Sequence, residues 1–546
     1  MIRTRNQIVQ QVTAKYLDTL DMDAVPTPEQ VESELLEMTQ QEFALENNLL
    51  DGEDKKNGFK RPQVLFNEQI AMLLAKLYHT KNIVTSDTTA DASFDLLGFY
   101  ASEGESKGLY VTSEMEIDRL IALYNPSIDT HNMKEVSAIL KRISPRRECC
   151  KDPDLIAVNN GIFDYREKTL SPFDKDLIFL SKSKVDYNPN AVNVTIHNDE
   201  DGTDWDVESW VNDLSDDPEI TNLLWEIMSA IIRPNVRWNK SAWLFSETGN
   251  NGKGTLCELM RNLCGPGSYA SIPLSDFSHE FMLEPLTTIS AIIVDENDVG
   301  QYIDKLANLK AVITNDVIQI NRKYRTPISC RFRGFMVQCL NEFPRIRDRS
   351  NSVYRRQLFV PMTKCFTGRE RGYIKTDYLH RPEVLEYVLY RVLNTDFYKL
   401  SEPKACRNVL DEYKEYNDTI RQFWNDVSEE FKWDLLPFTF LYALYKAWFA
   451  ENAPSGTVQN RNMFIIDLLA IIKEDDTWIC LDKNKKNWTG QKMAKSEPLI
   501  AQYNLTEWMN PGTQKTNKEQ LCHPPVQGSY RGILRRTDEI NAALKA

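Results

Sequence analysis

Long apolar runs are missing from this sequence. No stretch reaches the roughly 18 consecutive apolar residues that a membrane-spanning helix needs, and the most apolar run, 464–472, is broken by Asp467. The charged N-terminus, MIRTRNQIVQQ, is not followed by the apolar segment of a secretory signal. We therefore expect a cytoplasmic protein with no membrane partner.

Paired cysteine motifs are missing as well. The ten cysteines are scattered, none forms a Cys-x-x-Cys pattern, and the one adjacent pair is Cys149 and Cys150. Cys522 and His523 have no further pair at the spacing of a zinc site. In a long chain without a signal, this usage favours free thiols in a reducing compartment over disulfides or structural zinc.

An excess of positive charge is the third absence. Lys and Arg number 65 against 79 Asp and Glu, which gives a net charge of −14. This balance excludes a protein that coats nucleic acid with its whole surface, but it permits a local basic patch. With 42% hydrophobic and 26% charged residues and no repeat, the chain has the composition of a globular protein of about three or four domains.

The order of predicted elements divides the chain into five segments. Residues 1–62 are helical and acidic, and 63–200 mix helices and strands, with a hairpin at DLIAVNNGIFDY. Two amphipathic helices fill 201–240. From 241 to 375 apolar strands alternate with helices, which predicts a mostly parallel sheet in an α/β fold. Residues 376–546 are helical at first and end in a compact α/β piece.

The segment AWLFSETGNNGKGTLCELM, 242–260, predicts a strand, a loop of small residues and a helix. In such a loop, successive backbone N–H groups and the helix N-terminus form a cradle for a phosphate. Gly249 and Gly252 let the backbone approach the anion, and Lys253 is expected to reach the β- and γ-phosphates. A tight strand–helix connection without a ligand is the alternative.

This loop departs from the pattern G-x-x-x-x-G-K-[ST] at two places. Glu247 stands at the first glycine, and Gly254 stands where a Mg²⁺-binding Ser or Thr is usual, with Thr255 one place later. A second segment supports the phosphate interpretation. ISAIIVDEND, 289–298, predicts a buried strand that ends in Asp295 and Glu296.

The two carboxylates are expected at the same edge of the sheet as the glycine loop, because ligands of open α/β sheets lie beyond the carboxyl ends of the strands. One of Asp295 and Glu296 would hold Mg²⁺, and the other would orient or deprotonate water. A solvated turn is the alternative. A further apolar strand, from Arg333, ends at Asn341, whose amide would hydrogen-bond a γ-phosphate or its attacking water.

A basic stretch lies between 321 and 356. It holds ten basic and two acidic residues, a local balance of +8 in an acidic chain. VIQINRKYRTPISCRF alternates like a hairpin, with a basic and aromatic tip formed by Arg322, Lys323, Tyr324 and Arg325. Cations beside an aromatic ring suit the backbone and bases of single-stranded DNA. A solvated surface hairpin is the alternative.

Together these residues resemble the superfamily 3 helicases, and more closely the helicase part of the poxvirus, phage and plasmid primase-helicase family. The resemblance covers residues 90 to 540 and includes the segments NNGIFDY, DVESWVNDL, GNNGKGT, IIVDE, LKAVITNDVIQINRKYR, NEFPRIRDRSNSVYRRQLFVPM and DEYKEYNDTIRQF. It implies a P-loop NTPase core of AAA+-like type. It also implies an N-terminal α+β domain, a helical collar and a C-terminal winged-helix-like domain.

The resemblance implies ATP and Mg²⁺ as cofactors. The loop would be the Walker A motif, with nucleotide-binding residues Gly249, Asn250, Asn251, Gly252, Lys253, Gly254 and Thr255. Asp295 and Glu296 would form Walker B, with Mg²⁺ held by Thr255 and Asp295. Lys310 would lie at the ATP site, and Asn341 would sense the γ-phosphate.

The resemblance also implies a ring, expected to be a hexamer. Arg356 would be an arginine finger offered to the neighbouring subunit's ATP, with Arg355 as the alternative. The hairpin tip would grip single-stranded DNA in the central channel. The implied function is an ATP-driven helicase that acts on single-stranded and forked DNA and replicates a phage, plasmid or other mobile element, in a bacterial cytoplasm.

Two alternatives stay open at this stage: a primase-helicase with an unrecognised N-terminal primase site, and a AAA+-like remodelling ATPase that does not unwind DNA. The first 200 residues show no carboxylate pair on a strand of the kind a two-metal polymerising site needs. The acidic stretch DEDGTDWD, 199–206, predicts an exposed loop or helix cap instead. A primase or an origin-binding protein would then be a separate partner.

Overall fold

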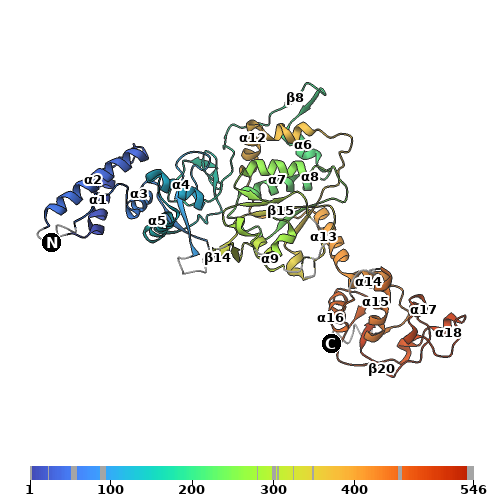
Figure 1. Cartoon of the computed structure of the whole chain (residues 1–546). Coiled ribbons are helices and arrows are strands. Elements are labelled where there is room, and N and C mark those ends of the chain that lie inside the picture. Colours follow the sequence, from blue (N-terminus) through green and yellow to red (C-terminus); the bar gives the residue numbers. More distant parts are fainter. Residues whose placement is uncertain are drawn as a thin grey trace. The chain divides into compact units, whose positions relative to one another are not determined.

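The computed structural model describes residues 3–22, 24–50, 58–85, 94–279, 281–297, 303, 306–323, 325–346, 350–452 and 458–537. The chain divides into two compact units, Met1–Leu410 and Asp411–Ala546 (Figure 1). Residues 376–410 therefore belong to unit 1, beyond the boundary expected at 375. Their side chains, among them Leu379 and Leu389, are buried in the same core as the central sheet.

Unit 1 begins with helices and a mixed sheet around one apolar core. Thr4 with Gln7, and Thr27 with Gln30, form capping boxes that start the first two helices. Buried residues from before and after position 62 share this core, so the expected helical segment 1–62 is continuous with the domain that follows. The helices are α1 (Arg5–Thr19), α2 (Pro28–Asn48), α3 (Asn67–Leu77), α4 (Glu114–Tyr124) and α5 (Thr130–Ile143).

The strands of this region form a sheet in the order β3–β2–β1–β4, in which only β1 and β4 are parallel. Their bounds are β1 (Lys81–Val84), β2 (Leu96–Tyr100), β3 (Tyr110–Val111) and β4 (Arg146–Glu148). The predicted Asn-Asn-Gly hairpin is confirmed, and a third strand extends it: β5 (Leu155–Val158), β6 (Gly161–Asp164) and β7 (Thr169–Ser171).

The acidic stretch 199–206 forms a surface hairpin and a helix cap, as predicted. It connects β8 (Ile196–Asn198) to β9 (Thr203–Trp205), and the Asp206 carboxylate caps α6 (Val207–Asp213) by accepting from the Ser209 N–H. Asp201 accepts a hydrogen bond from the Tyr373 hydroxyl at 2.6 Å. Two of these carboxylates are therefore used in local structure.

The predicted parallel sheet is confirmed, with five strands in the order β11–β12–β15–β10–β16. β15 is inserted between β10 and β12, so the strands that precede the glycine loop and the two carboxylates are separated by the strand that ends before Asn341. The bounds are β10 (Ser241–Phe245), β11 (Tyr269–Ala270), β12 (Ala291–Val294), β15 (Phe335–Leu340) and β16 (Gln357–Pro361).

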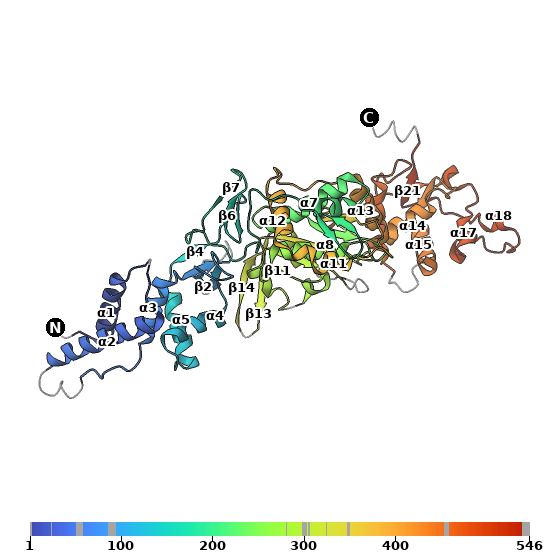
Figure 2. The ribbon, with the colours of Figure 1, turned by 90° about the horizontal axis from the view of Figure 1, so that it is seen from above.

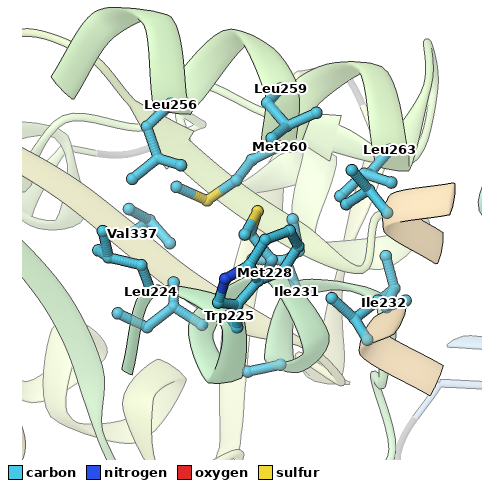
Figure 3. Close-up of a cluster of buried hydrophobic side chains, with 14 of the residues drawn as sticks. Leu224, Trp225, Met228, Ile231, Ile232, Leu256, Leu259, Met260, Leu263 and Val337 are labelled. Atoms are coloured by element: carbon cyan, nitrogen blue, oxygen red, sulfur yellow. The ribbon is translucent and has the colours of Figure 1, made fainter. Parts of the chain in front are cut away.

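The expected collar helices form, but the second is part of the sheet's own core. α7 (Pro218–Ile232) starts at Pro218 after the Asp217 cap and packs against α8 (Lys253–Cys264), α12 (Pro382–Leu393) and β15. Figure 3 shows its Leu224, Met228 and Ile231 facing the Leu256–Leu263 side of α8. Residues 201–240 are thus not a separate layer, because α7 is apolar on nearly all sides and covers the sheet.

Unit 2 has its own aromatic-rich core of helices and a three-stranded antiparallel sheet, β17–β21–β18. Trp433, Tyr445 and Trp478 are buried there. The elements that enclose this core are α14 (Thr419–Val427), β17 (Leu435–Pro437), α15 (Phe438–Asn452), α16 (Arg461–Ile472), β18 (Trp478–Ile479) and β21 (Gly532–Arg535). Within the described residues, no helix is both long and apolar enough to cross a membrane.

The two separate cores predict two unfolding transitions. Leu259→Ala in unit 1 and Leu441→Ala in unit 2 each remove a fully buried side chain. Each should cost about 2–5 kcal/mol and lower only the transition of its own unit. Differential scanning calorimetry of the full chain measures both transitions in one experiment, and each variant serves as the control for the other. A single transition lowered by both variants would contradict the division.

Candidate functional site

The loop between β10 and α8 takes the left-handed backbone that an anion cradle needs. Asn250 has φ of 52° and Gly252 has φ of 82°, directly before the first turn of α8. A Cβ at Gly252 would lie 2.6 Å from Leu214 Cδ2, so only glycine fits. The α carbon of Gly249 faces open space. No acidic side chain stands in the first turn of α8, which leaves this helix N-terminus suited to an anion.

The Lys253 ammonium is buried and joins the ends of two strands. It donates to Ser246 O at 3.2 Å, to Leu340 O at 3.1 Å and to Asn341 Oδ1 at 2.7 Å. Burial lowers the pKa of Lys253 below the usual value of a lysine, while the nearby Asp295 charge acts in the opposite direction. Lys253 and Asn341, predicted from separate segments, are therefore in direct contact.

The Asp295 carboxylate lies against the first turn of α8. A Cβ at Gly254 would lie 3.0 and 3.1 Å from its two oxygens. This contact gives a physical reason for Gly254, since a Ser or Thr there would push against the carboxylate. Thr255, one place later, is half-buried, and Glu296 is exposed. The predicted loop and Asp295 are thus adjacent, with Glu296 next to them on the solvent side.

An amide pair of the buried Gln338 and the half-buried Asn297, which was not predicted, fixes the segment after β12. Asn297 Nδ2 donates to Gln338 Oε1 and to Cys339 O, each at 3.0 Å, and Asn297 Oδ1 accepts from Leu274 N. Gln338 is fully buried and donates to Ile272 O at 3.2 Å. The sequence feature that could have indicated this pair is Gln338 itself, because a polar side chain inside the apolar strand FMVQCL needs a hydrogen-bond partner.

The segment after β16 holds the outer side of the loop, which the sequence analysis also missed. Phe366 N donates to Asn250 O at 2.7 Å, and Asn250 Nδ2 donates to Thr367 Oγ1 and Glu370 Oε1 at 3.2 and 3.1 Å. Lys364 forms an ion pair with Asp216 at 2.7 Å. No sequence pattern marks this segment, because its role comes only from the position of β16 beside β10.

Two thiols lie beneath the loop. Cys257 Sγ on α8 and Cys339 Sγ on β15 are 3.3 Å apart, and both are buried. The hydrogen bond with Cys257 and burial raise the pKa of Cys339 well above its usual value, so the Cys339 thiol stays protonated. All ten cysteines are free, as the scattered pattern predicted.

The predicted arginine finger lies at the other edge of the sheet. Arg355 and Arg356 precede β16, and Ser241 N, at the start of β10, donates to Arg356 O at 2.9 Å. Arg356 is half-buried and donates from Nη1 to Ser352 O of the preceding short helix α10 (Asn351–Tyr354), whereas Arg355 is exposed. In a parallel sheet, this amino edge is opposite the edge that carries Lys253.

Lys310 is half-buried on α9 (Ala307–Ile313), which packs against η3 (Leu274–Ser278) and β13 (Val317–Arg322). Its expected place at the nucleotide stays a prediction.

The predicted basic hairpin forms from β13 and β14 (Arg325–Arg331), with Lys323 exposed at the turn. Tyr324 lies outside the described residues, and for Arg325 only the backbone is described. Arg322 is half-buried and lines a cavity of 640 Å³. The other walls of this cavity come from β2, α4, α5 and η4 (Glu284–Thr287).

The base of this hairpin is anchored on both sides. Thr85, after β1, donates from Oγ1 to Ser329 O at 2.7 Å, and its backbone carbonyl accepts from Arg331 N at 3.2 Å, so the hairpin adjoins the N-terminal sheet (Figure 2). Asn315, with φ of 53°, caps Phe332 O and Gly334 O through its side-chain amide. Asparagine tolerates this left-handed backbone, which otherwise favours glycine.

Three family models match the chain. The model described as D5 N terminal like matches residues 71–229, a family of unknown function (DUF5906) matches 244–356, and the model described as Poxvirus D5 protein-like matches 415–509.

Apo structures of the NrS-1 C terminal region are similar at low identity. One has 13% identity and a TM-score of 0.36, with 70% of this chain and 82% of that chain covered. Another has 12% identity and a TM-score of 0.39, with 82% and 95% covered. The family models are therefore the informative comparison. The two D5 matches lie on either side of the sheet that carries the site, so the chain is similar to D5-like proteins over residues 71–229 and 415–509.

Proposed function

We propose that this chain is an ATP-driven DNA helicase of superfamily 3 that works as a ring, expected to be a hexamer, on single-stranded and forked DNA. The observation that carries the proposal is the direct contact of Lys253 with Asn341, next to Asp295 at the N-terminus of α8. A cation, an amide and a carboxylate at one edge of a parallel sheet suit a nucleoside triphosphate with Mg²⁺. The similarity to the two D5-like family models supports a role in DNA replication.

Each site residue has a task in this proposal. Lys253 exchanges the carbonyls of Ser246 and Leu340 for phosphate oxygens. The first turn of α8 supplies backbone N–H groups, of which Lys253 N now donates to Asn251 Oδ1 at 3.3 Å. Asp295, with Thr255, would hold Mg²⁺, which supplies charge neutralisation at the phosphates. The exposed Glu296 orients water or takes its proton, and Asn341 contacts the γ-phosphate.

The ring is supported by the position of the arginines. Arg355 and Arg356 lie at the amino edge of the sheet, whereas Lys253 lies at the carboxyl edge, so neither arginine is near its own chain's loop. A neighbouring subunit that presents its amino edge would bring them to ATP. The exposed Arg355 is better placed to reach a neighbour than Arg356, whose Nη1 is bound to Ser352 O.

Replacing the buried lysine should stop ATP hydrolysis. Lys253→Ala is expected to lower kcat by roughly 10²–10³-fold, because it removes a cation from a water-poor site. The matched control is Lys240→Ala. Lys240 directly precedes β10, at the end of that strand opposite the loop, and forms an ion pair with Glu402. A phosphate-release assay measures both variants. Full turnover by Lys253→Ala would contradict the phosphate cradle.

Mixing two inactive variants tests whether the finger acts between subunits. Lys253→Ala and a variant with Arg355→Ala and Arg356→Ala should each be inactive alone. Mixed rings contain interfaces with an intact lysine from one chain and intact arginines from the other. We therefore expect ATPase activity to return on mixing. If the mixture stays as inactive as its components, the arginines do not act in trans.

The hairpin discriminates a helicase from an ATPase that remodels proteins. Replacing Arg322, Lys323 and Arg325 by Ala should abolish unwinding of a fork and lower the salt dependence of single-stranded DNA binding. The slope of log affinity against log salt should fall by about 2 in magnitude, at roughly 0.7 per phosphate contact. Lys404→Ala, an exposed lysine on α13 (Lys404–Asn417), is the control. DNA binding by the triple variant that equals that of the unchanged chain would favour the remodelling alternative or place the DNA contact outside the hairpin.

A further inference from the structure

An exposed tryptophan stands on the surface of unit 2. Trp488 ends the short strand β19 (Asn487–Trp488), which pairs with β20 (Ser529–Tyr530). Its side chain is 71% exposed, the highest fraction for a large hydrophobic residue in the described part of the chain. Much of the indole is therefore in contact with water, whereas many other aromatic side chains of this unit are buried in its core.

The indole is held from beneath by two glycines. A Cβ at Gly490 would lie 3.3 Å from Trp488 Cδ1, and a Cβ at Gly528 would lie 3.7 Å from Cζ3. The ring therefore extends over both backbones. Thr489 fixes that backbone, because its N–H donates to Gly528 O at 3.0 Å and its hydroxyl donates to Gln527 O at 2.9 Å. The glycines support the ring without covering its outer side.

Five lysines surround this tryptophan in the sequence, with Asp482 as the only acidic residue between 480 and 495. Lys483, Lys485 and Lys486 are exposed in the loop before β19, and Lys492 and Lys495 follow it. None of the five forms an ion pair within 4.0 Å with a residue that the structure describes. The Asp482 carboxylate instead accepts from Asn484 N at 2.8 Å, and its carbonyl from Lys485 N, so it shapes the loop.

Lysines without an ion-pair partner, close in sequence to an exposed indole, fit one class of ligand, and Lys492 Nζ already lies 3.4 Å from Trp488 O. The phosphates of a nucleic acid would pair with the lysine charges, and an unstacked base would stack on the indole. The bases of a duplex are already stacked on each other and are not free to do so. An acidic peptide would use the lysines but leave the ring exposed. Single-stranded DNA therefore matches both features of this surface.

We propose that Trp488 and the lysines of the 483–486 loop form a second contact for single-stranded DNA, in unit 2 and separate from the β13–β14 hairpin. The site uses neither the nucleotide loop nor the hairpin, so its failure and the failure of the proposed function are distinguishable. Single-stranded DNA bound at both sites would dissociate from the protein more slowly than DNA bound by the hairpin alone.

The test uses the full chain carrying Arg322→Ala, Lys323→Ala and Arg325→Ala, so that the hairpin contributes little. We expect this variant still to bind fluorescently labelled dT20, as measured by fluorescence anisotropy. Trp488→Ala should weaken this binding by about tenfold or more, and Trp488→Phe should retain most of it, because a phenyl ring still stacks. Lys485→Ala with Lys486→Ala should lower the salt slope by about 1.4.

The matched control is Lys446→Ala with Lys473→Ala, two exposed lysines of the same unit that lie on α15 and after α16. This variant should bind as its parent does. Photocrosslinking with 5-iodouracil in the oligonucleotide gives a second readout, in which a modified peptide containing Trp488 supports the proposal. Affinity unchanged by Trp488→Ala, or crosslinks confined to unit 1, would overturn it. A duplex that competes as well as dT20 would overturn the single-strand assignment.

Discussion

The burial of one ammonium group organises the candidate active site. A lysine placed out of water needs several acceptors, and Lys253 finds three of them at the carboxyl ends of β10 and β15. The same contacts bring the loop, Asn341 and, through the first turn of α8, Asp295 together. Two of the three acceptors are neutral carbonyls that phosphate oxygens can replace at a gain in charge pairing. In the proposed function, a nucleotide would therefore meet a site that is already ordered.

The parallel sheet also decides what one chain can do alone. All its strands run in the same direction, so the loop lies at one edge and Arg355 and Arg356 at the other. The β13–β14 hairpin lies in the same unit, and the hydrogen bond from Thr85 to Ser329 O connects it to the N-terminal sheet. Movement of the hairpin would therefore also move or strain the N-terminal sheet, which connects this region mechanically to the element that we propose contacts DNA. In that proposal, nucleotide hydrolysis at a subunit interface would act on DNA through the same compact unit.

The sequence allowed prediction of elements whose signal is local. The Asn-Asn-Gly hairpin, the α6–α7 pair and the parallel strands each follow from turn residues or apolar periodicity. The proximity of Lys253, Asp295 and Asn341 was predictable because carboxyl ends of parallel strands meet at one edge. The hydrogen bonds that Phe366 and Glu370 form with Asn250 were not predictable, because they depend on which strands become neighbours in the sheet. The packing of α7 into the core of the sheet was missed for the same reason, and the collar role of residues 201–240 stays a prediction.

The central claim concerns where the triphosphate binds. The most direct measurement is a structure of the full chain with Mg²⁺ and a non-hydrolysable ATP analogue. We expect the β- and γ-phosphates within hydrogen-bond distance of Lys253 Nζ and the first-turn amides of α8, with the metal next to Asp295. Lys253 would then have left Leu340 O. An analogue bound elsewhere, with the Lys253 ammonium still on its three present acceptors, would contradict the account.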